Sequence, residues 1–224
     1  MPCLLAGMTL VLSAAACRRC EVPHCPETLP ALHGIDISHH NTITAWDSLD
    51  VDFIFVKATE GADWVDVSFQ ANLDSARKHG IPVGAYHFLT TTSPAADQFA
   101  SYSAMVPRDS VDLRPVLDVE CMTKGHRMGR KAFVAHVGQW ISLCQSHYGI
   151  KPILYSSRRF YRLHLKRDFD GCPFWCGDIN AGPAYVDAEN WLLWQYAIEK
   201  LDGSAGKVDR DMLRPGKTLE DLRM

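Results

Sequence analysis

The sequence predicts an α/β protein: an irregular TIM-like (β/α) barrel of eight strands, with helices missing or short in its second half. From about residue 33, short apolar runs rich in β-forming residues alternate with longer amphipathic stretches, a pattern typical of strands joined by crossover helices. Most runs are apolar on both faces, as parallel strands closed into a barrel are. At 224 residues, 47% of them hydrophobic, the chain is long enough for one such domain and short for two.

Eight runs are predicted to form the barrel strands, because each is apolar and of ordinary strand length. In chain order they cover residues 34–38, 52–59, 82–88, 114–120, 151–157, 174–179, 191–196 and 207–212.

Three amphipathic stretches are predicted to form helices between the early strands. Residues 67–79 end at Gly80, a C-cap signal that Pro82 follows. Residues 95–105 follow Ser93-Pro94, which predicts an N-cap and then proline at the first helical position. Residues 131–148 carry one apolar stripe and end before Gly149. After residue 171 the connections are too short or too rich in Gly and Pro for full crossover helices, so plain loops are expected there.

The N-terminal segment differs from the rest. Residues 3–16 form an uncharged apolar run that ends in small residues, which is too short to span a bilayer and is typical of a secretory signal. Cys17 follows directly and resembles the acylated cysteine of bacterial lipoproteins. We expect residues 1–16 to be a signal peptide, 17–32 a tether and 33–224 the barrel domain. The protein is then a periplasmic or outer-membrane lipoprotein that meets the membrane through its lipid, or else a secreted protein.

Charge and cysteine content limit the partners. The net charge of −3 argues against general binding to nucleic acid, which usually requires a basic domain. No disulfide is expected between Cys172 and Cys176, because four residues of strand span roughly 13 Å and a disulfide allows ~7 Å between Cα atoms. The cysteines near residue 20 lack a second pair of zinc ligands, so no metal is predicted, and no cofactor either. We expect a monomer.

Acidic residues recur at or just past the ends of the predicted strands. In parallel barrels these ends form the working face, where several carboxylates are costly unless they bind cations or serve chemistry. Asp118 and Glu120 share one face of a strand, so each shifts the pKa of the other. A protonated and an ionised carboxyl side by side are what glycosidic cleavage requires. The residues concerned are Asp36, Glu60, Asp118, Glu120 and Asp209.

Aromatic residues accompany these acids. Aromatic rings stack on the apolar faces of sugars, and the tips of Tyr and Trp form hydrogen bonds. Those near strand ends are predicted to line the cleft: Tyr86, Tyr155, Trp194 and Tyr196. Phe88, Trp140 and Trp191 are expected in the core instead.

Six segments in order, GIDISHHN, FIFVKATEG, PVGAYHF, PVLDVE, WLLWQY and VDRDM, closely resemble glycoside hydrolase family 25, the Chalaropsis-type lysozymes. The resemblance runs from about residue 34 to 213. It implies an irregular (β/α) barrel that cleaves the β-1,4 bond between N-acetylmuramic acid and N-acetylglucosamine in peptidoglycan. It also implies that Glu120 is the general acid, that Asp118, Asp36 and Asp209 are the other acids of the cleft, and that Tyr86 and residues 194–196 contact substrate. Glu60 of KATEG is carried over as well.

Several alternatives stay open. Asp118 either attacks the anomeric carbon or orients the substrate's own N-acetyl group. The rival functions are a non-catalytic peptidoglycan-binding lipoprotein on the same barrel and a hydrolase of another N-acetylated glycan such as chitin. Asp211 stands where the family commonly has Asn, and His39-His40 is assigned no role. The basic loop 122–131 is either solvated or contacts the lactyl group or stem-peptide carboxylates.

Overall fold

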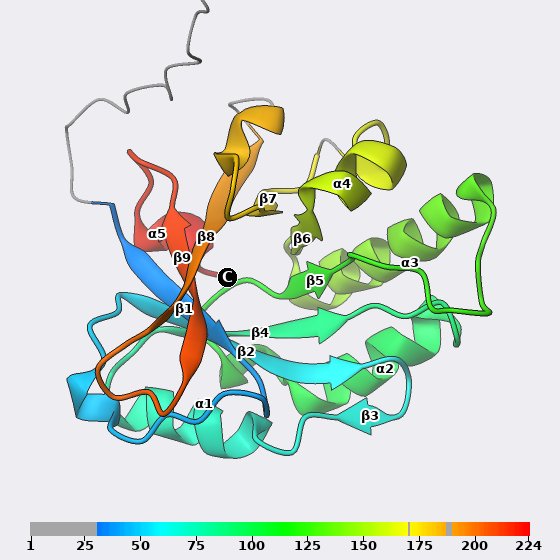
Figure 1. The fold of residues 1–224 in the computed structure, drawn as a ribbon. Helices are drawn as coiled ribbons and strands as arrows, with labels where there is room; N and C mark the ends of the chain where they lie inside the picture. The colour runs from blue at the N-terminus through cyan, green and yellow to red at the C-terminus, as the bar shows by residue number, and fades with distance from the viewer. Residues whose placement is uncertain (1–30, 170, 187–189) are drawn as a thin grey trace, which may run out of the picture.

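The computed structural model describes residues 31–169, 171–186 and 190–224, which form a closed β-barrel with helices packed against part of its outer surface (Figure 1). The predicted signal peptide, the lipidation site at Cys17 and nearly all of the tether lie outside these residues. None of the helices in the described ranges is long and apolar enough to cross a membrane.

Nine strands make up the sheet, in the order β1-β9-β8-β7-β6-β5-β4-β2-β3, and pairing of β1 with β2 closes the barrel. All eight predicted strands are confirmed; the ninth, β3, is a two-residue strand paired with the end of β2 that was not predicted. The strands are β1 (His33–Ile37), β2 (Phe53–Glu60), β3 (Trp64–Val65), β4 (Val83–Phe88), β5 (Val116–Asp118), β6 (Ile153–Ser157), β7 (Phe174–Gly177), β8 (Trp191–Lys200) and β9 (Lys207–Leu213).

The expectation of a wholly parallel barrel was wrong for β9, which runs antiparallel to both β8 and β1. The physical reason is the connection between β8 and β9, which spans only residues 201–206. A parallel return needs a crossover of a dozen or more residues, whereas a short loop makes a hairpin. As a consequence, the beginning of β9 lies at the same barrel end as the C-terminal ends of the parallel strands.

The three predicted helices are confirmed as α1 (Phe69–Lys78), α2 (Ala95–Met105) and α3 (Arg130–Tyr148). Pro94 precedes the first helical residue of α2 instead of occupying it. The second half is irregular, as expected. Its connections hold single turns or slightly longer pieces: α4 (Arg158–Phe160), a π-helix (Tyr161–Leu165), a 3₁₀ turn (Gly182–Tyr185) and, after β9, α5 (Leu219–Leu222). Two further 3₁₀ turns, Trp46–Ser48 and Arg108–Ser110, lie in the first half.

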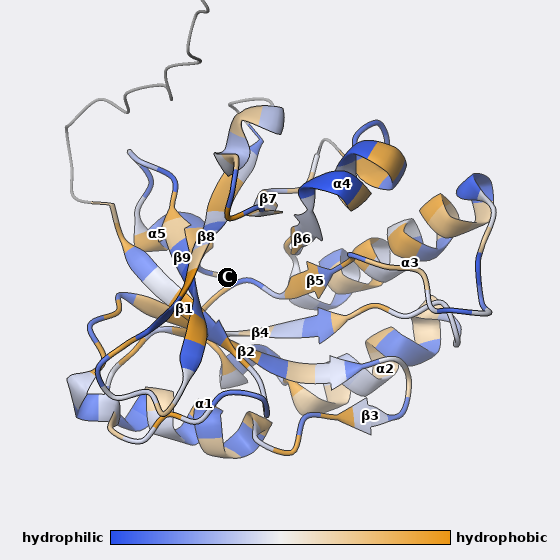
Figure 2. Ribbon diagram, viewed as in Figure 1, coloured by the Kyte–Doolittle hydropathy of each residue, from blue (hydrophilic) through white to orange (hydrophobic). Residues whose placement is uncertain are grey.

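One apolar cluster fills the interior of the barrel below the end at which the parallel strands finish. Phe53 and Phe55 of β2 lie over the glycines of neighbouring strands, where a Cβ at Gly34 or Gly84 would come within 2.4 Å of their rings. Trp175 packs against Phe55, with ring centroids 5.0 Å apart. A second cluster joins the outer barrel surface to α1, α2 and α3. In Figure 2 the helices α1, α2 and α3 carry both hydrophobic and hydrophilic residues, as helices with one buried face do.

The four cysteines Cys121, Cys144, Cys172 and Cys176 of the described residues carry free thiols. The expectation that Cys172 and Cys176 are not bridged is therefore confirmed. Cys176 lies within β7 and Cys172 two residues before its start, so the intervening backbone is largely extended.

Candidate active site

A cavity of about 440 Å³ lies above the apolar floor, at the barrel end where the parallel strands finish. Four of the predicted acids line it together: Asp36, Asp118, Glu120 and Asp209. We call this the active-site cavity, and its full lining is Asp36, Ser38, His40, Lys57, Tyr86, Phe88, Val116, Asp118, Glu120, Tyr155, Trp175, Gln195 and Asp209.

Strand alternation explains why these side chains meet. Residues two apart on a strand share a face, so Val116 lies on the floor of the cavity and Asp118 above it on β5. Lys57 stands in the same relation to Phe55 on β2. Asp209 is the third residue of β9 and pairs directly with Asp36 of β1. The reversed direction of β9 is what brings an acid from the beginning of a strand to this end of the barrel.

Asp36 is held by the amide of Gln195, which the family resemblance included in the substrate-contacting segment 194–196 without a role of its own. Gln195 of β8 donates from Nε2 to Asp36 Oδ2 at 2.8 Å and accepts a hydrogen bond from the Tyr155 hydroxyl at 3.0 Å. The chain Tyr155–Gln195–Asp36 therefore crosses the cavity from β6 to β1 and fixes the orientation of the carboxyl group. The sequence signal was the position of Gln195 between two aromatic residues, which drew attention to its neighbours instead.

Asp211 places a fifth carboxyl beneath this chain. It is completely buried, and Trp175 Nε1 donates to its Oδ1 at 3.0 Å. Its Oδ2 receives no hydrogen bond from any donor of the described residues. Burial, followed by the charges of Asp36 and Asp209, raises the pKa of Asp211 well above its ordinary value. The acids above Asp211 therefore oppose its ionisation, in addition to burial.

The acids of the cavity are harder to ionise than usual. Burial, followed by the negative charge of Asp209, raises the pKa of Asp36 to about 7. Burial and the charge of Glu120 raise the pKa of Asp118 well above its ordinary value. The pKa of Glu120 is also raised, by burial first and by Asp209 second. Burial alone raises the pKa of Asp209. Like charges in one low-dielectric site thus favour the protonated forms of one another.

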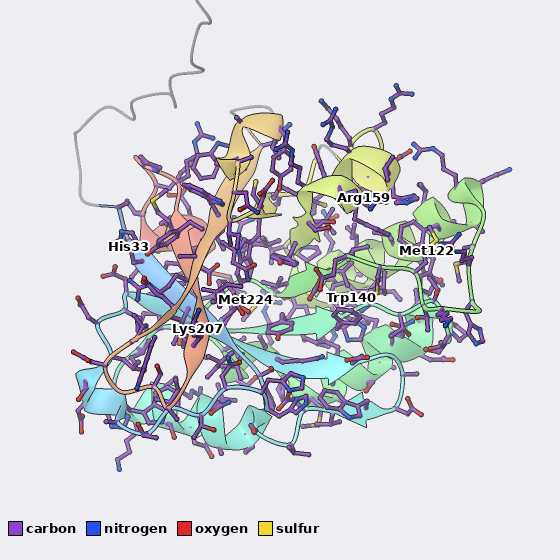
Figure 3. All side chains as sticks on the ribbon, in the orientation of Figure 1. His33, Met122, Trp140, Arg159, Lys207 and Met224 are labelled. Carbon is purple, nitrogen blue, oxygen red and sulfur yellow. The ribbon has the colours of Figure 1, made fainter. Side chains whose placement is uncertain are left out.

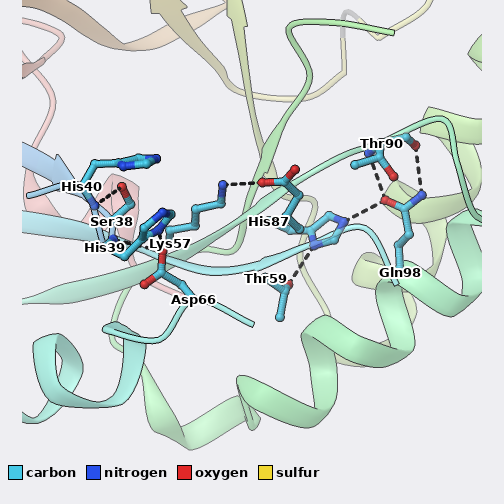
Figure 4. Close-up of polar contacts among 10 residues, drawn as sticks. Ser38, His39, His40, Lys57, Thr59, Asp66, His87, Thr90 and Gln98 are labelled. Carbon is cyan, nitrogen blue, oxygen red and sulfur yellow. Dashed lines mark hydrogen bonds and ion pairs between the residues drawn. The ribbon is translucent and has the colours of Figure 1, made fainter. Parts of the chain in front are cut away.

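Lys57 provides the opposing charge. Its Nζ donates to Glu60 Oε2 at 2.7 Å, the dashed line from Lys57 in Figure 4. The same ammonium group lies over the rings of Trp64 and Phe88, 4.8 and 5.0 Å from their centroids. The ammonium group lowers the pKa values of Asp118 and Glu120, in opposition to burial. Glu60 itself lines a neighbouring cavity of about 480 Å³ that shares Phe88 with the first.

A buried polar network behind Lys57 stiffens the ends of β2 and β4. Thr59 and Gln98 bond the two ring nitrogens of His87 at 2.8 and 3.1 Å, and burial lowers the pKa of that histidine to about 4 (Figure 4). His39 bonds Asp66 at 2.8 Å, whereas His40 lines the active-site cavity. His40, like Lys57 and Trp175, was not among the predicted site residues.

The predicted aromatic residues divide into two groups. Tyr86 and Tyr155 line the active-site cavity. Trp194 and Tyr196 do not, because Gln195 between them points into the barrel and its strand neighbours point outward. Trp194 Nε1 donates to the carbonyl of Asp178 at 2.8 Å, and the Tyr196 hydroxyl lies 3.1 Å from His33 Nδ1.

Of the three aromatic residues expected in the core, Trp140 is fully buried there, as predicted. The expectation was wrong for Phe88, which is half-buried and lines the active-site cavity beneath Lys57. Trp191 is also only half-buried; it packs against the core and carries the Arg214 guanidinium 5.8 Å from its ring centroid.

Comparison with known proteins gives consistent results. Residues 35–203 match the model of glycosyl hydrolases family 25. The chain is 30% identical to uncharacterized protein YegX of Escherichia coli K12, over 86% of this chain and 72% of that one. It is 29% identical to lysozyme M1 of Streptomyces globisporus, over 83% and 69%. Among solved structures, a family 25 glycosyl hydrolase from Bacillus anthracis superposes with a TM-score of 0.79 at 28% identity, covering 91% of this chain and all of that one.

Proposed function

The chain belongs to glycosyl hydrolase family 25, and on that premise we propose that it is a muramidase, which hydrolyses the β-1,4 bond between N-acetylmuramic acid and N-acetylglucosamine in peptidoglycan. The observation that carries the proposal is the convergence of Asp36, Asp118, Glu120 and Asp209 on one cavity. Glycosidic cleavage needs an acid for the leaving oxygen and an anion for the developing positive charge, and this cavity holds carboxyls able to serve as both. Lysozyme M1, to which the chain is similar, supports the choice of glycan.

Glu120 acts as the general acid in this proposal. It follows directly after β5 and is more exposed than Asp118, so it lies nearer an entering glycan. Its raised pKa keeps the carboxyl protonated at the start of the reaction. The proton passes to the glycosidic oxygen as the bond to the anomeric carbon breaks, and the resulting carboxylate then takes a proton from the attacking water.

Asp118 lies one strand step deeper and stabilises the anomeric centre. Its buried Oδ1 has no hydrogen-bond partner within the described residues, so it is free to accept a bond from substrate. We propose that it orients the 2-acetamido group of the muramyl unit, whose carbonyl oxygen then attacks the anomeric carbon. Direct attack by Asp118 is the alternative. A stable thiazoline analogue of the cyclised acetamido intermediate separates them: it inhibits strongly in the first mechanism and weakly in the second.

The remaining groups set the charge and shape of the cavity. Asp36, held by Gln195, and Asp209 maintain a negative potential around Glu120, which favours its protonated form. Tyr86 and Tyr155 present rings and hydroxyl groups to the sugars. Trp194, Tyr196 and Glu60 lie outside the active-site cavity, and we propose that they contact more distant sugars of the strand.

Location outside the cytoplasm remains a proposal from residues 1–17, as lipidation of Cys17 does. Cys17→Ser is expected to move the protein from the membrane fraction to the soluble exported fraction. If the variant stays with the membrane to the same extent, the lipid anchor is not at Cys17. We also propose a monomer, which sedimentation of the purified protein tests directly.

The experiment for the function is the digestion of purified peptidoglycan, with mass analysis of the soluble fragments. Muramic acid at the new reducing ends establishes a muramidase, and N-acetylglucosamine at those ends excludes one. Binding to peptidoglycan without release of fragments favours the binding-protein alternative. Cleavage of chitin oligomers at a comparable rate favours a broader hydrolase of N-acetylated glycans.

A further inference from the structure

A basic groove continues the active-site cavity along β6 and β7. It has a volume of about 730 Å³ and is lined by Ser157, Arg158, Arg159, Arg162, Leu163, Gly177 and Asp178, which together we call the arginine groove. Neither the family assignment nor the catalytic proposal uses these residues.

The arginine groove is joined to the active-site cavity through Tyr155. That residue lines the cavity, and Ser157, two positions further along β6, shares its face and lines the groove. Ser157 pairs with Gly177 of β7. A Cβ at Gly177 would lie 2.5 Å from the Tyr155 hydroxyl, so this hydroxyl lies directly against the wall of the groove. A group attached to a sugar in the cavity therefore reaches the groove within one strand step.

The charge of the groove is opposite to that of the cavity. Residues 158–167, with the sequence RRFYRLHLKR, contain Arg and Lys but no acid, in a chain of net charge −3. Arg158 is partly neutralised by Asp178 at 3.5 Å and lies over the Tyr185 ring. The exposed Arg159 and Arg162 form no salt bridge with any described residue. Arg159 is labelled on this outer element in Figure 3.

An apolar side chain lies among these charges. Leu163 is 60% exposed and lines the groove together with Arg159 and Arg162. It belongs to the π-helix Tyr161–Leu165, a rare conformation that is frequent at functional sites. A ligand that fits both features carries carboxylates separated by small apolar groups. A phosphodiester polymer matches the arginines but offers nothing to Leu163.

We propose that the arginine groove binds the peptide stem of the muramyl unit, with Arg159 and Arg162 pairing with its carboxylates and Leu163 contacting its alanine methyl groups. The inference rests on the proposed muramidase function, because it is the glycan in the active-site cavity that delivers the stem to the groove. Arginine is suited to the role, since its planar fork pairs with a carboxylate in two parallel hydrogen bonds. The groove thus makes the enzyme selective for glycan that still carries peptide.

The test compares two glycans and two double variants. The substrates are peptidoglycan freed of other wall polymers, and the same glycan after an amidase has removed its peptides, which leaves only the lactyl carboxylate. Arg159→Gln with Arg162→Gln alters the groove. Lys166→Gln with Arg167→Gln is the matched control, because both residues are exposed cations of the same segment outside the groove lining.

For the groove variant we expect a rise of about tenfold in KM on the peptide-bearing glycan, since each exposed charge pair contributes roughly three- to fivefold. Its kcat on that glycan, and its kcat/KM on the peptide-free glycan, should stay within about twofold of the wild type. The control variant should keep wild-type KM and kcat on both glycans. The inference would be overturned by any of three results: an equal loss of kcat/KM on both glycans, an equal loss of kcat/KM in the control variant, or an unchanged KM of the groove variant on the peptide-bearing glycan. A loss of kcat/KM that appears only when other anionic wall polymers are present would also overturn the inference.

Binding measurements separate this inference from the proposed function. The disaccharide N-acetylglucosaminyl-N-acetylmuramic acid contains no bond that a muramidase cuts, so its binding with and without an attached tetrapeptide can be measured by calorimetry. Tighter binding of the peptide form by the wild type but not by the groove variant supports the arginine groove even if hydrolysis fails. Cleavage of both glycans with equal binding of both disaccharides leaves the muramidase standing and refutes the groove.

Discussion

Asp209→Asn should move the pH dependence of the reaction to lower pH. Of all neighbouring charges, that of Asp209 raises the pKa of Asp36 the most, and the same holds for the pKa of Glu120. The substitution removes this charge while keeping the size of the side chain. Both pKa values should therefore fall. Because the general acid must be protonated, the alkaline limb of kcat/KM should fall with the pKa of Glu120.

The magnitude follows from Coulomb's law. Two unit charges ~7 Å apart interact by ~1.2 kcal/mol at an effective dielectric constant of ~40, between that of a protein surface and that of water. Since 1.36 kcal/mol corresponds to one pKa unit, the limb should move down by about one pH unit. One unit beyond the wild-type limb, the variant should accordingly be about tenfold slower than the wild type.

The assay is release of reducing ends from soluble glycan strands across pH 4–9 at fixed ionic strength. Asp202→Asn is the matched control, because it removes the same charge from the exposed turn between β8 and β9. Its profile should coincide with that of the wild type. An alkaline limb that stays in place or moves upward in Asp209→Asn would show that Asp209 does not control the acid, and the electrostatic reasoning would be refuted.

Three further predictions concern the same cavity. Lys57→Met removes the cation that lowers the pKa of Glu120, so the alkaline limb should move upward, opposite to Asp209→Asn; a downward shift contradicts this. Asp211→Asn removes a buried acid whose pKa is raised by burial and by the charges of Asp36 and Asp209. The pKa of Asp36 is raised to about 7, so the stability it contributes is complete below about pH 4 and lost as pH rises through 7. The raised pKa of Asp211 adds to this loss in the same direction, so the fall in Tm between pH 4 and 8 should become smaller in Asp211→Asn; an unchanged fall would contradict the raised pKa of Asp211. Gly177→Ala places a methyl group 2.5 Å from the Tyr155 hydroxyl and 2.8 Å from its ring carbon Cζ, and should destabilise the protein by about 1–3 kcal/mol. Because the ring itself is in the way, adding Tyr155→Ala should reduce the further loss of Tm caused by Gly177→Ala, whereas an equal loss in both backgrounds would locate the strain elsewhere.

Much of the fold was predictable because strand and helix patterns are local. The apolar runs, Gly80 and Gly149 defined elements that the structure confirms within a few residues. Strand direction was not predicted for β9, although the short connection after β8 already required a hairpin. Strand direction depends on the length of a connection and not on the composition of the strand. The segment VDRDM is therefore compatible with a parallel and with an antiparallel strand. The two-residue β3 is too short to leave any pattern.

The site was predictable where chemistry and position coincide. The i, i+2 spacing of Asp118 and Glu120 and the placement of acids at strand ends brought four cavity residues together in advance. The choice between the faces of β8 was not predictable from the run WLLWQY, because aromatic residues favour a cleft and a barrel exterior equally well. Gln195 was therefore placed in the contacting segment only together with its aromatic neighbours, although it alone of the three reaches the cavity. Lys57 was missed because a single cation within an apolar strand gives no sign of its partners.

Glu120→Gln tests the central claim most directly. The amide keeps the size of the side chain but has no proton to give to the glycosidic oxygen. Release of muramic acid reducing ends should fall by at least about a hundredfold, a typical contribution of general acid catalysis, while the Tm and binding to insoluble peptidoglycan stay near wild-type values. Glu220→Gln, on the surface of α5, should leave all three measurements unchanged. Near-full release of muramic acid ends by Glu120→Gln would contradict the assignment of Glu120 as the acid, and with it this account of the cavity.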